Sequence, residues 1–287
     1  MKASSLDLAD KQELNFLAEL IADLRAVAPH VGVLLVGAMA RDLLLYYAHG
    51  IRAARATEDV DLALAVADWN DFERLCESLL TSGSFEPLSK VAHKLLYRRR
   101  MEVDLIPFGG VERADGTIAW PSKGDTVMRV LGFQEALASS ISAVLPLGQS
   151  VAVVSLSMLA VLKILAWSER RTREPRKDAS DLILILHSYL DAGQAERLYS
   201  EADHLLAAGE FDYERAGSWL AGKDAVMLMR RHSANSNRIE ETVRSIVALE
   251  IDPEGPLRLI GELKDTDLER ARLLLTAFLA GFNGEHS

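Results

Sequence analysis

The spacing of hydrophobic and polar positions changes near residue 155, and this change divides the chain into two regions. Before it, short apolar runs that are typical of strands alternate with segments of helical spacing. After it, apolar residues recur every three to four positions, first in "SLSMLAVLKILAWSERR" and then in five further segments. The pattern predicts a first domain over residues 1–150 and an all-α domain over residues 151–287.

The first region alternates helical and strand patterns in an order that predicts a mixed sheet. The expected elements are helices over 6–28, 40–50 and 67–83, strands over 33–36 and 59–66, two strands around a basic turn within 93–109, and one more strand within 146–156. Asp68 or Asn70 can cap the third helix, and Gly83 can end it. The predicted fold class is therefore α+β: a mixed sheet with flanking helices, followed by an all-α domain.

Composition indicates a globular protein without a membrane anchor. The chain has 287 residues, of which 49% are hydrophobic and 26% charged, enough for one large domain or two smaller ones. No apolar run is long enough to span a bilayer, and the first twenty residues have the pattern of an amphipathic helix rather than a signal peptide. The single cysteine, Cys76, lies in a helical pattern and is expected in the core. These features predict a reducing, cytoplasmic setting.

The charge balance limits the partners that can be expected. The formal net charge is −10, so long-range electrostatics do not attract a polyanion, and contact with a nucleic acid needs a local basic patch. Candidates are the three arginines at 98–100 and the run "ERRTREPRK" at 169–177. Either patch can equally be a solvated loop.

A glycine follows the first predicted strand. In "VGAMARD" the strand runs into Gly37 and then into the start of a helix. A helix N-terminus presents unpaired backbone N–H groups, and a glycine allows a phosphate to approach the backbone closely. This arrangement suits a triphosphate, although a glycine in this place is also common in a simple tight turn.

Three aspartates in strand patterns are candidate metal ligands. In "RATEDVDLAL", Asp59 and Asp61 are two positions apart and therefore lie on the same face of a strand. Like charges so close repel each other, and either a bound cation or exposure at a sheet edge relieves the repulsion. The third, Asp104, lies among apolar residues in "MEVDLIPFG", where a lone buried charge is costly. Converging carboxylates favour Mg²⁺, which binds proteins through carboxylates and substrate phosphates.

Together these segments resemble the nucleotidyltransferase superfamily that includes DNA polymerase β, poly(A) polymerase and the CCA-adding enzymes. Gly37 and Ala38 stand at the glycine turn of that pattern, and the three aspartates match its carboxylates. The string "GAMARD" is similar to the GGxxRD element of the CCA-adding enzymes, with Arg41 and Asp42 matching. Ala38 departs from the Ser or Gly of the family, which removes a hydroxyl but leaves the backbone N–H to bond a phosphate.

A later segment, "LKILAWSERRTREPRKDASDL", resembles the downstream motif of the AbiEii-type nucleotidyltransferases, the toxins of type IV toxin–antitoxin and abortive-infection systems. The motif is LKxxAxxxR, a short basic spacer, and then K/R-D-x-x-D-L. The matching residues are Leu162, Lys163, Ala166, Arg170, Lys177, Asp178, Asp181 and Leu182. The resemblance spans about residues 30–190, and the motifs are specific only as a set.

The resemblance implies a role for each matching polar residue. Lys163 would reach the nucleotide phosphates, although it can also be a lysine whose stem packs on the core. Asp178 would be a catalytic or acceptor-binding carboxylate. Asp181, three positions later on the same helix face, would bind nucleotide or stabilise the helix N-terminus. Cationic contacts are implied to the triphosphate or an RNA backbone at Arg170 and Lys177, and to the triphosphate at Arg41 and Arg55.

These patterns predict a Mg²⁺-dependent nucleotidyltransferase that transfers NMP from an NTP to a hydroxyl and releases pyrophosphate. The resemblance implies tRNA as the acceptor, a toxin role and a cognate antitoxin as partner. A small molecule, as in the aminoglycoside nucleotidyltransferases, and a protein hydroxyl are alternative acceptors, because the acidic net charge does not favour RNA. The third alternative is a module that binds nucleotide without catalysis, and the presence of all three aspartates speaks against it.

Overall fold

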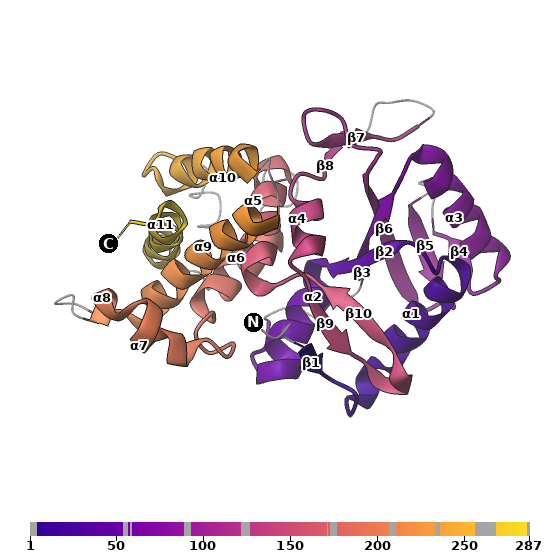
Figure 1. The fold of residues 1–287 in the computed structure, drawn as a ribbon, viewed down its shortest axis with the longest axis horizontal. Coiled ribbons are helices and arrows are strands. Elements are labelled where there is room, and N and C mark those ends of the chain that lie inside the picture. Colours follow the sequence, from indigo (N-terminus) through magenta and orange to yellow (C-terminus); the bar gives the residue numbers. More distant parts are fainter. Residues whose placement is uncertain are drawn as a thin grey trace. The chain divides into compact units, whose positions relative to one another are not determined.

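The chain forms two compact units in the computed structural model (Figure 1). The structure describes residues 5–53, 57, 59–88, 93–121, 127–170, 172, 177–206, 211–232, 236–255 and 268–285. One unit, the sheet unit, comprises Met1–Leu43 and Ala54–Ser155, and the other, the helical unit, comprises Leu44–Ala53 and Leu156–Ser287. The chain thus passes into the helical unit at 44–53, a segment that the sequence pattern assigns to the first domain. Its His49 ring lies against Gly193 of that unit, which explains the grouping.

The sheet unit is built on an eight-stranded mixed sheet, which confirms the predicted fold class. The strand order is β1 (Ser5–Asp7), β9 (Ile141–Val144), β10 (Ser150–Val153), β2 (Gly32–Val36), β3 (Asp59–Val66), β6 (Met101–Gly109), β5 (Lys94–Tyr97) and β4 (Phe85–Pro87). The central pair β3 and β6 is parallel, whereas β2 and β5, which flank it, are antiparallel to their neighbours β3 and β6. A separate two-stranded sheet joins β7 (Thr117–Ala119) to β8 (Val127–Arg129).

Four α-helices accompany the described part of this sheet: α1 (Asn15–Val27), α2 (Gly37–Asp42), α3 (Trp69–Thr81) and α4 (Phe133–Ala138). α3 begins as its sequence predicts, because the Asp68 side chain accepts a hydrogen bond of 2.9 Å from the backbone N–H of Asp71. Cys76 of α3 is buried, and burial raises the pKa of its thiol to about 12, which confirms it as an unreactive core residue. α2 runs directly into a π-helical segment, Leu43–Tyr47.

The prediction of one helix over residues 6–28 is wrong at its start. Residues 5–7 form β1, which pairs in parallel with β9, and the α-helix begins only at Asn15 after a 3₁₀ turn. A strand of three residues leaves no periodic signal, and it forms here because a partner far along the chain pairs with its backbone. Strands β4, β7, β8 and β9 and helix α4 also lie outside the predicted elements.

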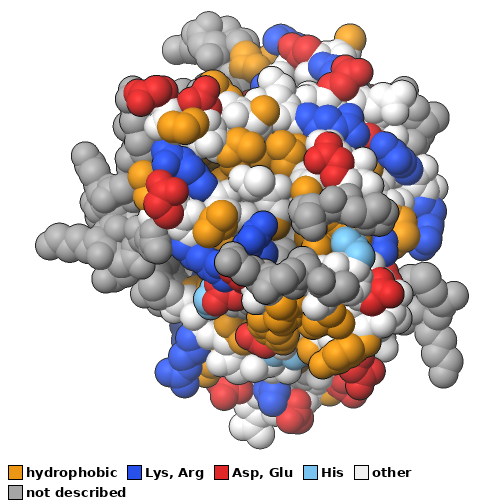
Figure 2. Space-filling view, turned by 90° about the vertical axis from the view of Figure 1, so that its left-hand side faces the viewer, with side chains coloured by type: hydrophobic (Ala, Val, Ile, Leu, Met, Phe, Trp, Pro, Cys, Tyr) orange, Lys and Arg blue, Asp and Glu red, His pale blue; other side chains and the backbone are white. Residues whose placement is uncertain are grey.

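The predicted basic turn at residues 98–100 connects β5 to β6 and is largely engaged in ion pairs. Arg98 contacts Asp23 of α1 at 3.0 Å, and Arg99 contacts Glu86 of β4 at 2.7 Å. On the face drawn in Figure 2, Lys and Arg side chains are likewise interspersed with Asp and Glu side chains. The described part of this face offers mixed charge rather than one continuous basic field.

The described part of residues 156–287 contains helices and turns and no strand, as its spacing predicts. Its α-helices are α5 (Leu156–Arg170), α6 (Lys177–His187), α7 (Leu198–Glu201), α8 (Asp203–Leu206), α9 (Tyr213–His232), α10 (Ser236–Ile251) and α11 (Leu268–Asn283). α9 and α11 pack closely, because a Cβ atom at Gly222 would lie only 2.0 Å from the carbonyl oxygen of Phe278. No helix in the described ranges is long and apolar enough to cross a membrane.

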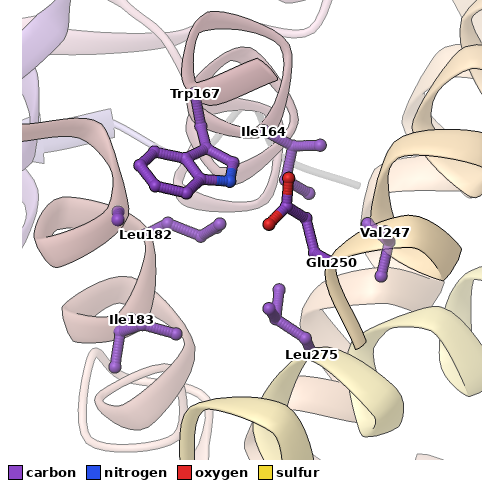
Figure 3. A pocket seen from close by; sticks show the side chains of 8 residues that line it. Ile164, Trp167, Leu182, Ile183, Val247, Glu250 and Leu275 are labelled. Atoms are coloured by element: carbon purple, nitrogen blue, oxygen red, sulfur yellow. The ribbon is translucent and has the colours of Figure 1, made fainter. Parts of the chain in front are cut away.

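A small, mostly apolar cavity lies between four helices of the helical unit (Figure 3). Its lining comes from α5, α6, α10 and α11: Ile164, Trp167, Ala179, Leu182, Ile183, Val247, Glu250 and Leu275. The carboxylate of Glu250 points toward the side chains of α5 (Figure 3). The cavity belongs to the core of this unit, since the side chains that line it, apart from Glu250, are aliphatic groups and the indole of Trp167.

Candidate active site

Four strands place a glycine, two carboxylates and an ammonium side by side at one end of the central sheet. Asp61 on β3 is level with Val36 on β2, the residue before Gly37. On the other side, Asp61 is level with Asp104 on β6, which in turn is level with Lys94 on β5. Residues that are level on neighbouring strands point to the same face. We call this row the carboxylate edge.

Gly37 lies directly under the Asp61 carboxylate. Its φ of +68° is in the left-handed region, and a Cβ atom added there would lie 1.9 Å from Oδ2 of Asp61. Any other residue would therefore displace this carboxylate and strain the backbone. The glycine turn and the D-x-D pair meet as the sequence pattern requires.

Asp59 extends the carboxylate edge by one step along β3. It precedes Asp61 by two positions, so both side chains share a face, and its neighbour on β6 is Glu102. Asp59 and Asp61 are both half-buried, whereas Glu102 is exposed. Glu102 thus adds a fourth carboxylate to this face, one that the sequence pattern did not single out.

Asp104 is held by an ion pair that the sequence analysis missed. Lys94 Nζ donates a hydrogen bond of 2.5 Å to Oδ2 of Asp104, while Oδ1 is buried and makes no hydrogen bond. Burial lowers the pKa of Lys94, but the bond to Asp104 and the charges of Asp104, Asp61 and Asp59 outweigh burial, so the pKa of Lys94 is raised. The three aspartates are therefore close enough for all of them to act on one ammonium.

The donor atoms at the carboxylate edge fit a hard cation such as Mg²⁺, since they are carboxylate oxygens on one face of neighbouring strands. Within the residues that the structure describes, however, no three His, Cys, Asp or Glu side chains are grouped closely enough to hold a metal ion as they stand. The predicted triad of Asp59, Asp61 and Asp104 shares a face without forming a closed ligand set. Asp104 is instead paired with Lys94.

An aromatic group lies beside Asp104. The His93 ring stacks on Trp120 with a centroid distance of 4.0 Å, and Trp120 also packs against Trp69 of α3. Burial lowers the pKa of His93 more than the nearby Asp104 raises it, so the ring is neutral at neutral pH. His93 directly precedes β5, and its buried Nδ1 makes no hydrogen bond.

The cationic contacts predicted around the glycine turn are not all available at the surface. The side chain of Arg41 is 1% exposed and donates hydrogen bonds of 2.8 and 2.6 Å to Asp42. Thr57 also bonds to Asp42, which fixes this pair at the C-terminal end of α2. Ala38 is buried at the start of the helix. Arg55 lies outside the described residues.

The predicted site residues of the later motif form a second, buried cluster in the helical unit. Lys163 on α5 donates to Asp178 at 3.2 Å and to Asp181 at 2.7 Å, both on α6. Arg170 adds two hydrogen bonds to Asp178, of 3.0 and 2.9 Å. Lys163, Asp178 and Asp181 are buried, and Lys177 is half-buried at the start of α6. We call these residues the α5–α6 cluster.

Lys94 could have been found by counting along the chain. The two strands around the basic turn pair Tyr97 with Met101, so each step back from the turn on one strand matches a step forward on the other. Three steps lead to Lys94 opposite Asp104. The necessary assumption is that the turn closes a regular hairpin, and the sequence pattern alone does not establish it.

Comparison with known proteins adds one match. A family model described as "Nucleotidyl transferase AbiEii toxin, Type IV TA system" matches residues 20–285, and therefore includes both units. A search of curated proteins finds no match to the chain.

Proposed function

Since the chain belongs to the family of AbiEii nucleotidyl transferase toxins of type IV toxin–antitoxin systems, we propose that it transfers a nucleoside monophosphate from Mg²⁺-bound NTP to a hydroxyl of tRNA. As a member of this family it is a nucleotidyltransferase with an NTP as substrate and an antitoxin as partner. The acceptor, the metal and an action in the cytoplasm are parts of the proposal.

One observation carries the proposal: the Asp61 carboxylate lies over Gly37 and is level with Asp104. A glycine turn leaves room for a phosphate, and the carboxylates beside it supply oxygen ligands for the cation that accompanies the phosphate. The two features serve the same ligand only if they meet in space. Here the distance from a Cβ position at Gly37 to Oδ2 of Asp61 is 1.9 Å.

The residues of the carboxylate edge would divide the work as follows. Asp59 and Asp61 would hold Mg²⁺, which supplies charge neutralisation for the triphosphate when bound. Gly37 and the backbone N–H of Ala38 would receive the phosphates. Asp104 would accept a hydrogen bond from the acceptor hydroxyl and take its proton as the hydroxyl oxygen attacks the α-phosphate in line. The new O–P bond would form as the bond to pyrophosphate breaks, and pyrophosphate would leave. Most of the rate would come from positioning and charge neutralisation.

The residues of the α5–α6 cluster have proposed roles of their own. Arg170, whose side chain is partly exposed, and Lys177 would contact the triphosphate or the RNA backbone. Lys163 could bind a phosphate only by leaving Asp178 and Asp181, which now share its ammonium. We therefore propose that Lys163 contributes mainly by fixing α5 against α6, with a phosphate contact as its second role.

The proposal is tested by incubating the protein with each labelled NTP, total tRNA and Mg²⁺. We expect label in the tRNA band with wild type, and none with Asp61→Asn or after chelation with EDTA. Label on a small molecule or a protein instead of tRNA would overturn the acceptor and favour the alternative transferases. Binding of NTP without any turnover would overturn the catalytic proposal and favour a binding module.

The toxin role has a separate test. Expression of the chain alone should slow bacterial growth, and Asp61→Asn should relieve the effect because it removes a proposed metal ligand. Toxicity that survives the substitution at an unchanged protein level would separate growth inhibition from nucleotidyl transfer.

A further inference from the structure

The pairing of two strands places Lys94 opposite Asp104, the third aspartate of the carboxylate edge. β5 and β6 pair with Tyr97 opposite Met101, which sets Lys94 opposite Asp104. Its Nζ lies 2.5 Å from Oδ2, a short charge-assisted contact. The backbone register of the two strands therefore places the ammonium next to Asp104.

Lys94 brings a positive charge to the carboxylate edge. Its ammonium pairs directly with Asp104, and Asp61, level with Asp104 on the neighbouring strand, lies on the same face.

A divalent cation at Asp104 would have to share that carboxylate with the ammonium. Mg²⁺ binds carboxylate oxygens at about 2.1 Å, so an ion on Asp104 would lie a few ångströms from Nζ, and like charges at that distance repel. Paired metal sites normally use a carboxylate to bridge or flank two ions about 4 Å apart. Here the ammonium already occupies one oxygen of the carboxylate best placed for a second ion.

The carboxylates of this face outnumber its lysine. Asp59, Asp61, Asp104 and Glu102 share the face, and Lys94 pairs with Asp104. No closed group of three possible metal ligands exists within the described residues, in agreement with a carboxylate that has been taken up by another cation.

We propose that the ammonium of Lys94 takes the place of a second divalent cation at Asp104, so that the site uses a single Mg²⁺ ion held by Asp59 and Asp61. The inference rests on the nucleotidyl transfer proposed above and specifies its metal requirement. Lys94 is a positioning residue in this arrangement. It holds Asp104 by Oδ2 and leaves Oδ1, which makes no hydrogen bond in the protein, for the acceptor hydroxyl.

The test counts the bound metal ions. Mn²⁺ is the probe, and electron paramagnetic resonance reports the number of bound ions and whether they are coupled. The protein is saturated with an α,β-methylene NTP analogue, which cannot transfer its nucleotide. We expect about one Mn²⁺ per chain with an uncoupled spectrum for wild type, and about two spin-coupled ions for Lys94→Met, because two ions about 4 Å apart interact magnetically. Mg²⁺ dependence of the rate should change in parallel from first order to higher order.

Three variants make the result specific. Lys94→Arg keeps the positive charge and should bind one ion, and Lys94→Met with Asp104→Asn should return to one ion because the second ligand is gone. Lys11→Met is the matched control, since Lys11 has the same exposed side-chain fraction, 38%, and also pairs with an aspartate, but follows β1 at the opposite edge of the sheet. Circular dichroism and a thermal melt establish that each variant is folded.

The outcomes separate the two proposals. Two coupled ions in wild type, or a single ion in folded Lys94→Met, would overturn the role of Lys94 and leave nucleotidyl transfer intact. No ion in any form of the protein would overturn both the metal requirement and the inference built on it.

Discussion

The two units arrange charge in opposite ways. The carboxylate edge of the sheet unit gathers three half-buried aspartates and one lysine on one face, and one buried oxygen of Asp104 makes no hydrogen bond. In the α5–α6 cluster of the helical unit, Lys163 and Arg170 pair with Asp178 and Asp181, and both carboxylates are more deeply buried. A buried carboxylate oxygen without a hydrogen bond indicates a missing ligand, whereas a buried carboxylate that is paired destabilises the fold when its partner is removed.

This difference predicts that function and stability respond separately to mutation in the two places. A substitution at the carboxylate edge should remove activity at little cost to stability. A substitution in the α5–α6 cluster should destabilise the protein whatever it also does to the reaction.

The largest expected effect is that of Asp61→Asn on the rate. Loss of a charged metal ligand should lower nucleotidyl transfer by about 10³-fold or more. The free energy of unfolding should stay the same or rise, because one of several repelling carboxylates is gone. Labelled-NTP transfer and urea unfolding measure the two quantities.

Asp115→Asn is the control, because Asp115 is an exposed carboxylate of the sheet unit that bonds only to neighbouring Thr117 in the hydrogen bonds assigned to it. Its rate should equal that of wild type. A wild-type rate for Asp61→Asn would contradict the assignment of the carboxylate edge as the active site.

The next effect is that of Lys163→Met on stability. The change leaves Asp181 without its 2.7 Å ammonium partner in a buried position, and breaking a buried pair in this way costs about 3–5 kcal/mol in unfolding free energy. Urea unfolding measures it. The double variant with Asp181→Asn should recover part of the loss, because the buried carboxylate that lost its ammonium is replaced by a neutral amide.

The exposed pair Arg74–Asp71 on α3 provides the comparison, since Arg74→Met should change stability by less than about 1 kcal/mol. An equally small change for Lys163→Met would show that the α5–α6 cluster is not a stabilising set.

Gly37→Ala should affect both quantities by an intermediate amount. A methyl group would meet the Asp61 carboxylate and displace it, and a shift of about 1 Å at a reacting group costs roughly 10²-fold in rate. The positive φ adds about 1–3 kcal/mol of strain to the folded state.

Gly83→Ala isolates the strain from the clash. Gly83 has a φ of +78° at the end of α3, and no atom lies within 4 Å of its Cβ position. It should lower stability without lowering the rate. A rate for Gly37→Ala equal to that of Gly83→Ala would exclude the contact between the turn and Asp61 as a functional feature.

The smallest predicted effect is on the acid stability of the helical unit. Hydrogen bonds from Arg270 lower the pKa of Asp212 from 3.8 to about 2. A carboxylate with a depressed folded-state pKa stabilises the protein above its unfolded pKa, and the contribution is lost as the pH falls from about 4 through about 2. Because the pair is partly exposed, we expect about 1–2 kcal/mol.

Urea unfolding of wild type and Arg270→Met between pH 6 and pH 2 measures this contribution. The difference between the two proteins should be constant above pH 5 and shrink below pH 4. A difference that stays constant down to pH 2 would contradict the assignment to Asp212.

Local patterns in the sequence determined several features without help from the fold. Asp59 and Asp61 share a face because side chains alternate along any strand, and Asp68 caps α3 because its side chain needs to reach only three residues ahead. The helices of the later region follow from their 3.6-residue period. Each of these depends on interactions within a few residues of the chain.

Only the tertiary structure decided which residues stand beside the D-x-D pair. The parallel pairing of β3 with β6 sets Asp104 level with Asp61, and the pairing of β5 with β6 adds Lys94. The tertiary structure also buries Arg41, which bonds to Asp42, and it forms β1 from a segment expected to be helical. Strand order and register are fixed by contacts between segments that are distant in the sequence, and no local pattern encodes the free energy of those contacts. The set of charged residues at the carboxylate edge depends on this order and register.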